Sequence, residues 1–213
     1  RRSSDLGRST ITTTDKNITR DTTQTPSGSL KFETGTAGRY VNLGGGASHD
    51  SNIDGAITVE TWIKCSALKP TWNIIASRWF TAPDGLTGVR DWHFSIHNNR
   101  LNLYTTGQDD LSGAKDFSVS GCSNSEWLLV GFSLSAASNG TLQFYVNGRP
   151  DGAAHTNVSH SAQATAVLLL GDARVSTAFQ GYMSRFRIYD TALSSADILA
   201  NFNNEASTYG YST

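Results

Sequence analysis

Residues 179–192, which read FQGYMSRFRIYDTA, decide the fold of this chain. Alternate side chains of a β-strand lie on opposite faces. One face of this predicted strand therefore carries Tyr182, Phe186 and Ile188, and the other carries Met183, Arg185, Arg187 and Tyr189. Gly181 opens the strand, and the pattern after Asp190 and Thr191 becomes helical. We expect this strand to close a sheet.

The residues that follow predict one short C-terminal helix. Ser194-Ser195-Ala196-Asp197 has the form of a capping box, in which a serine and an acid three positions later satisfy each other's backbone. Apolar side chains then recur at helical spacing, and we expect them to pack on the sheet. They are Ile198, Leu199 and Phe202.

The closing stretch, residues 181–194 or GYMSRFRIYDTALS, resembles the last strand of laminin-G-like, concanavalin-A-like jelly rolls, a superfamily related to the pentraxins. A second match is ITVETWIK at residues 57–64. Residues 30–33 and 40–43 resemble the first two strands of that family, and Val146-Asn147-Gly148 resembles one of its turns. The resemblance covers residues 29–204. It implies an all-β fold: an antiparallel β-sandwich of the jelly-roll type.

Residues 57–64 form the predicted central strand. Its apolar side chains share one face, and that face carries Ile57, Val59 and Ile63. The opposite face carries Glu60 and Trp62, so a carboxylate lies among hydrophobic groups and needs a partner. We predict an ion pair between Glu60 and Arg187 of the closing strand.

An extended polar arm at residues 1–28 precedes the jelly-roll domain at residues 29–213. Residues 9–25 contain eight threonines, and their only apolar side chains are Ile11 and Ile18. Such a segment cannot fold alone. Threonine and isoleucine suit an extended strand on a sheet edge. That edge belongs either to the same domain or to a neighbouring subunit.

Two cysteines, Cys65 and Cys122, do not form a metal-binding motif. They are either two buried thiols or one disulfide between strands, of the kind found in oxidising compartments. The resemblance favours the disulfide, because pentraxins have theirs between similarly placed elements.

Composition excludes two kinds of partner. The net charge is −1 and charged residues are 16% of the chain, so no field of one sign attracts nucleic acid or anionic lipid. No apolar run reaches membrane-spanning length, so we expect no membrane insertion.

Catalytic motifs are absent from the sequence. Retaining glycosidases need two carboxyl groups about 5 Å apart. The chain has four glutamates, none of them two residues from another acid: Glu33, Glu60, Glu126 and Glu205. The Gln-x-His strand of lyases with this fold is missing, because residues 95–97 read Ser-Ile-His. We therefore expect a protein that is not an enzyme.

Calcium is the cofactor that the resemblance suggests, held by loop carboxylates and carbonyls. Many relatives carry an acidic pair where this chain has Ser184 and Arg185, which argues against calcium at the last strand. The remaining candidate ligands are Asp50, Asp54, Asp109 and Asp110, although the sequence favours the interpretation that these are solvated loop acids.

Sugar recognition needs exposed aromatic rings beside planar hydrogen-bonding side chains. The loop from Trp72 to Arg90 and its surroundings supply both kinds. The candidate glycan ligands are Trp72, Arg78, Trp79, Phe80, Arg90, His93 and Tyr104. In addition, the polar side chains of WHFSIH, residues 92–97, mark a candidate concave surface. Edge packing of the loop aromatics is the alternative interpretation.

Two functional hypotheses follow. In the first, the chain is a non-catalytic structural or adhesion subunit, displayed outside a cell or on a virion, which assembles with neighbouring subunits through its arm, including Ile11 and Ile18. In the second, it is a free-standing lectin-like module that binds a glycan through the loop from Trp72 to Arg90.

Overall fold

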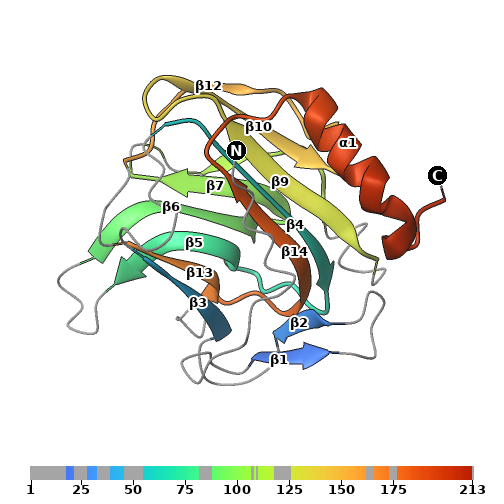
Figure 1. Ribbon diagram of the computed structural model, residues 1–213. Helices are drawn as coiled ribbons and strands as arrows, with labels where there is room; N and C mark the ends of the chain where they lie inside the picture. Colours follow the sequence, from blue (N-terminus) through green and yellow to red (C-terminus); the bar gives the residue numbers. More distant parts are fainter. Residues whose placement is uncertain are drawn as a thin grey trace.

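Two antiparallel β-sheets packed face to face make up the protein, as the computed structural model shows (Figure 1). The structure describes residues 18–21, 28–32, 39–45, 55–81, 88–106, 108, 110–117, 126–161, 166–172 and 177–212. Within these residues the chain forms strands, one α-helix and one short 3-10 helix. The all-β sandwich with a short C-terminal helix is therefore confirmed.

The larger sheet has eight strands. Its order is β1 (Ile18–Asp21), β2 (Ser29–Phe32), β14 (Gly181–Tyr189), β4 (Ile57–Cys65), β9 (Leu128–Leu134), β10 (Gly140–Val146) and β11 (Arg149–Pro150), and β12 (His155–Val158) also pairs with β10. The closing strand β14 thus lies inside the sheet, between the N-terminal ribbon and the central strand.

The smaller sheet has six strands. Its order is β3 (Arg39–Gly45), β13 (Val167–Asp172), β5 (Asn73–Thr81), β6 (Gly88–His97), β7 (Arg100–Thr105) and β8 (Leu111–Ser112). Asn98 and Asn99 join β6 to β7 with φ of 47° and 59°. Positive φ at both central residues is the geometry that two-residue hairpins favour, and it fixes the β6–β7 register.

The main core fills the space between the sheets. Phe94 of the smaller sheet meets Phe132 of the larger at 5.3 Å between ring centroids, and Trp92 meets the same ring at 5.8 Å. Ile57, Val59 and Ile63 belong to this core, as their alternation predicts.

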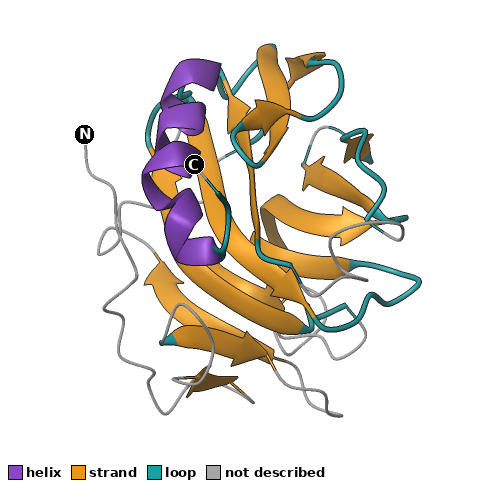
Figure 2. Cartoon of the chain, turned by 90° about the vertical axis from the view of Figure 1, so that its right-hand side faces the viewer, coloured by secondary structure: helices purple, strands orange, loops and turns teal. Residues whose placement is uncertain are grey.

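A second apolar cluster lies on the outer face of the larger sheet, where α1 (Ser195–Glu205) and the 3-10 helix η3 (Ala206–Tyr209) cover it (Figures 1 and 2). Trp62 is fully buried there, and its ring stacks on Tyr209 at 3.8 Å. The predicted capping box of Ser194 and Asp197 is formed, and Ile198 is buried. Leu199 is 37% exposed, and the covered part of its side chain lies against Gly148 in the turn between β10 and β11.

A β-bulge in β14 corrects the predicted alternation of the closing strand. Ser184 pairs with Trp62 and Arg187 pairs with Glu60, so two residues of β14 stand opposite one of β4. Arg185, at φ 52°, lies in this bulge. The bulge moves Met183 into the main core and leaves Tyr182 beside Trp127 on the outer face.

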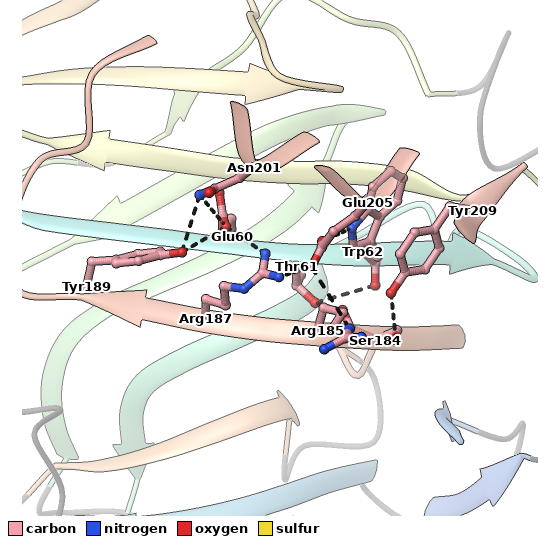
Figure 3. A network of polar contacts seen from close by, with 10 residues as sticks. All are labelled: Glu60, Thr61, Trp62, Ser184, Arg185, Arg187, Tyr189, Asn201, Glu205 and Tyr209. Carbon is pink, nitrogen blue, oxygen red and sulfur yellow. Dashed lines mark hydrogen bonds and ion pairs between the residues drawn. The ribbon is translucent and has the colours of Figure 1, made fainter. Parts of the chain in front are cut away.

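The predicted ion pair between Glu60 and Arg187 is formed beneath α1 (Figure 3). Arg187 Nη1 donates to Glu60 Oε1 at 2.9 Å, and its Nη2 donates to Glu205. Tyr189 Oη and Asn201 Nδ2 also donate to Glu60 Oε1, at 3.1 and 3.0 Å. Trp62 Nε1 donates to Glu205 at 2.7 Å, which ties the helix to the sheet.

Part of the N-terminal arm docks on its own domain. Residues 18–21 form β1 and pair with β2 of the same chain. For these four residues the structure shows the first of the two alternatives, pairing within the same chain. Ile11 lies outside the described residues, and the structure describes only the backbone of Ile18.

Cys65 is buried at the end of β4, and no free cysteine occurs among the residues that the structure describes. Its predicted partner, Cys122, lies outside them, so the pairing stays a prediction. Within the described ranges, no helix has both the length and the apolar character needed to cross a membrane.

Candidate functional site

The outer face of the six-stranded sheet gathers the polar side chains of β6 and β7. The hairpin register pairs His93 with Tyr104, Ser95 with Asn102, and His97 with Arg100. Because Trp92, Phe94 and Ile96 face the main core, these alternating partners face away from it. The sheet therefore presents three polar cross-strand pairs side by side.

Aromatic rings cluster on this face. The ring of Trp72, at the end of the β4–β5 connection, stacks on His97 at 3.6 Å and meets His93 edge-to-face at 4.8 Å. Tyr104 stacks on His93 at 5.1 Å and lies 6.0 Å from Trp72, nearly perpendicular to it. Trp72, His97 and Tyr104 are half-buried, so each keeps part of its surface at the protein exterior.

Hydrogen bonds hold the polar members of the face. Asn102 Nδ2 donates to Asp110 Oδ1 at 2.7 Å and to Ser112 Oγ at 3.2 Å. Asp110 Oδ1 also lies 3.1 Å from His97 Nδ1, and its side chain is 55% exposed. A carboxylate and an amide thus border the aromatic rings.

A buried charged group lies where β5 and β6 approach their connecting loop. Arg78 Nη1 lies 3.5 Å from Asp91 Oδ2, and His160 Nδ1 lies 3.1 Å from Asp91 Oδ1. The other nitrogen of His160, Nε2, lies 3.0 Å from the carbonyl oxygen of Gly55. Since both ring nitrogens face acceptors, the doubly protonated imidazolium suits this geometry.

The net effect of these surroundings raises the pKa of His160. Burial alone lowers it, but the hydrogen bonds to Asp91 and to the Gly55 carbonyl outweigh that effect. The group also bridges the sheets, because His160 follows β12 of the larger sheet and Asp91 belongs to β6 of the smaller sheet. Within the smaller sheet, Arg78 Nη2 donates to the carbonyl of Ala166 before β13. We therefore interpret the group as a structural support for the β5–β6 hairpin.

Two predicted glycan ligands are buried. Arg78 is fully buried, because an irregularity in the β5–β6 pairing turns it toward Asp91. His93 is only 6% exposed, because Trp72 and Tyr104 pack against its ring. The burial of Arg78 against Asp91 corrects the expectation that Arg78 contacts a sugar directly, whereas a contact through His93 depends on the position of the Trp72 ring and stays a prediction.

Trp72 and Tyr104 do come together, and both of their rings contact His93 of β6. The side chains of Trp79, Phe80 and Arg90 lie outside those that the structure describes. The predicted surface from Trp72 to Arg90 as a whole therefore stays a prediction.

The calcium candidates Asp50, Asp54 and Asp109 also lie outside the described residues. Among the residues that the structure describes, no group of three or more His, Cys, Asp or Glu side chains is arranged to hold a metal. Asp110 instead accepts the hydrogen bond from Asn102 described above. Calcium binding stays a prediction.

His97, Ser95 and Asn102 are the members of this face that the candidate list omits. The signal for them is present in the sequence. The Asn-Asn turn fixes the hairpin register, and counting outward from it pairs residue 97 with 100, 95 with 102 and 93 with 104.

A family model described as "Concanavalin A-like lectin/glucanases superfamily" matches residues 34–199, most of the described sandwich. The chain belongs to this superfamily. The resemblance drawn from the closing strand is thereby confirmed. A comparison with curated proteins gives no match.

Solved structures with the same fold are binding domains and a glycosidase. The binding domain of Paraclostridial Mosquitocidal Protein 1 superposes with a TM-score of 0.65 at 14% identity, over 89% of this chain and 46% of that one. The binding domain of botulinum neurotoxin DC in complex with rat synaptotagmin II gives 0.65 and 14%, over 89% and 45%. A Trypanosoma rangeli sialidase in complex with the inhibitor DANA gives 0.62 and 13%, over 88% and 28%. The chain thus spans less than half the length of each.

Proposed function

We propose that this domain is a non-catalytic, lectin-like module that binds carbohydrate through the outer face of its six-stranded sheet. The observation that carries the proposal is the half-buried Trp72, set against His97 and Tyr104 beside the amide of Asn102 and the carboxylate of Asp110. We further propose that the domain acts outside a cell or on a virion surface.

The chemistry of sugars fits this face. The apolar side of a sugar ring packs on an aromatic ring, and its hydroxyl groups hydrogen-bond to amides and carboxylates. Asp110 is more than half exposed, so its carboxylate is accessible to such hydroxyls. The aromatic rings and these polar groups lie on adjacent strands, so one small ligand is able to contact both.

Similar domains support a binding role. Two of the similar structures are binding domains, one of them in complex with rat synaptotagmin II, and a third is a sialidase in complex with an inhibitor. Two of the glutamates, Glu60 and Glu205, belong to the network beneath α1, which supports a non-catalytic role for them. Glycan binding is our preferred form of the binding role because the aromatic face is built for it.

A glycan array tests the proposal. The wild type should bind at least one glycan, and Tyr104→Ala should weaken that binding about tenfold, which corresponds to a stacking energy of about 1.4 kcal/mol. Ser133→Ala, on the larger sheet, is the control and should bind like the wild type. Absence of binding across a broad array of neutral and acidic glycans contradicts the proposal.

Assembly through the arm is a second candidate function. The observation in its favour is that β1 is the terminal strand of the eight-stranded sheet, and a terminal strand offers unpaired backbone groups to another chain. Light scattering over a range of protein concentrations tests it, with the full chain compared to a variant lacking residues 1–28. Equal masses for both proteins at every concentration would rule this role out.

A further inference from the structure

The position of the Trp72 ring follows from its two histidine contacts. Its centroid lies 4.8 Å from that of His93 and 3.6 Å from that of His97. The Cα atoms of these two histidines are about 13 Å apart along an extended strand. The histidine rings must therefore lean toward each other, and the Trp72 ring lies over the residue between them, Ser95.

Beneath this ring lies an incompletely hydrogen-bonded polar pair. Ser95 and its cross-strand partner Asn102 are both fully buried. The amide nitrogen of Asn102 is engaged by Asp110 and Ser112. Its Oδ1, and Ser95 Oγ, have no hydrogen-bond partner among the described residues. Buried polar atoms are rarely left unpaired, so these two need an explanation.

We propose that Trp72 is a lid over a hydroxyl-binding subsite whose floor is formed by Ser95 and Asn102. The inference rests on the proposed function, because the subsite is part of the same face. A sugar hydroxyl satisfies both floor atoms, since it donates to Asn102 Oδ1 and accepts from Ser95 Oγ.

The same floor selects the charge of the ligand. A carboxylate, sulfate or phosphate group offers only acceptors and leaves Asn102 Oδ1 unpaired. Such a group also meets the negative charge of Asp110, which is hydrogen-bonded to the same amide. The subsite therefore takes a hydroxyl group and excludes an acidic group from the same position, and the charge of Asp110 disfavours acidic sugars.

The connection that carries the lid is anchored just after it. The Asn73 side chain, which is buried, accepts from the backbone of Lys69 at 2.9 Å and donates to carbonyls of Lys69, Thr71 and Ile96 at 3.1–3.2 Å. Trp72 is thus able to rotate about its side-chain bonds while the backbone on both sides stays in place. Once open, the ring is free to pack on the bound sugar.

Labelling an introduced thiol tests the lid without any ligand. Ser95→Cys is reacted with N-ethylmaleimide, alone and combined with Trp72→Ala, and the modification is followed by mass spectrometry. A lid that is open about a tenth of the time slows labelling about tenfold. The labelling rate of Ser95→Cys should therefore rise about tenfold in the Trp72→Ala background. Ser133→Cys, buried on the other sheet, should label at the same slow rate in both backgrounds.

Equal labelling rates for Ser95→Cys with and without Trp72→Ala overturn the lid. The lid is also overturned if Trp72→Ala accelerates the labelling of Ser133→Cys as much as that of Ser95→Cys, because the variant then loosens the whole domain. The ligand class is tested on an array of neutral, sialylated, sulfated and uronate-containing glycans. Hits should be neutral, and Asn102→Ala and Ser95→Ala should each reduce them several-fold. Binding restricted to acidic glycans, or unchanged in both variants, overturns the subsite and indicates that only water occupies the floor. If no glycan binds at all, the proposed function fails, whereas the labelling result still decides the lid.

Discussion

Removal of Arg187 should strongly destabilise the domain. Its guanidinium is 12% exposed and contacts two carboxylates, those of Glu60, 1% exposed, and Glu205, 16% exposed. Arg187→Met leaves the Glu60 carboxylate buried beneath α1 without its cation, whereas Glu205 keeps Arg185, whose Nε lies 4.0 Å from Glu205 Oε1. Breaking a buried ion pair by removing one partner costs about 3–5 kcal/mol, and the hydrogen bonds retained by Glu60 place the expected loss near the lower limit.

The cycle of single and double variants isolates the pair. In Arg187→Met with Glu60→Leu, the buried carboxylate is gone along with its partner, so the double variant should lose less stability than Arg187→Met alone. Urea unfolding, monitored by circular dichroism and tryptophan fluorescence, measures the stability of the wild type, of Arg187→Met, of Glu60→Leu and of the double variant.

Two results would refute this reasoning. One is a loss below about 1 kcal/mol for Arg187→Met, which is the range of solvent-exposed ion pairs. The other is a double variant that loses the sum of the two single losses, because additive losses mean that the two residues do not interact.

Three further predictions concern other parts of the chain. Gly181→Ala should cost at least about 2 kcal/mol in urea unfolding, because a Cβ there lies 2.2 Å from the carbonyl oxygen of Lys64 at a φ of 142°, whereas Gly55→Ala, in open space, should be close to neutral. The contribution of His160 to stability should be complete below its ordinary pKa and should decline as the pH rises through its raised folded pKa. The melting temperature of the wild type should therefore fall with pH in that window more steeply than the melting temperature of His160→Leu. Parallel curves for the two proteins would contradict the assignment. Peptide mapping without reductant should recover Cys65 linked to Cys122, and two separate alkylated cysteines would disprove the disulfide.

Strand alternation was sufficient to predict the central strand and its ion pair. Glu60 on one face of β4 and Arg187 on one face of β14 are each fixed by a period of two, and the resemblance of the closing strand makes β14 a partner of β4. The same rule failed for Tyr182 and Met183, because the bulge at Arg185 inserts one residue into the pairing. Arginine carries no sequence signal for a positive φ, so alternation alone could not locate the bulge.

The candidate site was predictable only in part, for a related reason. The Asn-Asn turn fixes which residues of β6 and β7 are neighbours, and this places Tyr104 beside His93. The burial of Arg78 depends on irregular pairing between β5 and β6 and on His160, which is distant in sequence. Neither local spacing nor composition contains that information.

The position of β14 between β2 and β4 has a consequence for the order of folding. The N-terminal ribbon of β1 and β2 joins the larger sheet through β14, whose residues come about 150 positions later in the chain. Contacts so distant in sequence form late, because a long loop must close before they stabilise anything. The ribbon should therefore acquire its hydrogen-exchange protection together with β14, after the β9–β10 and β5–β6–β7 hairpins, although it precedes them all in the chain.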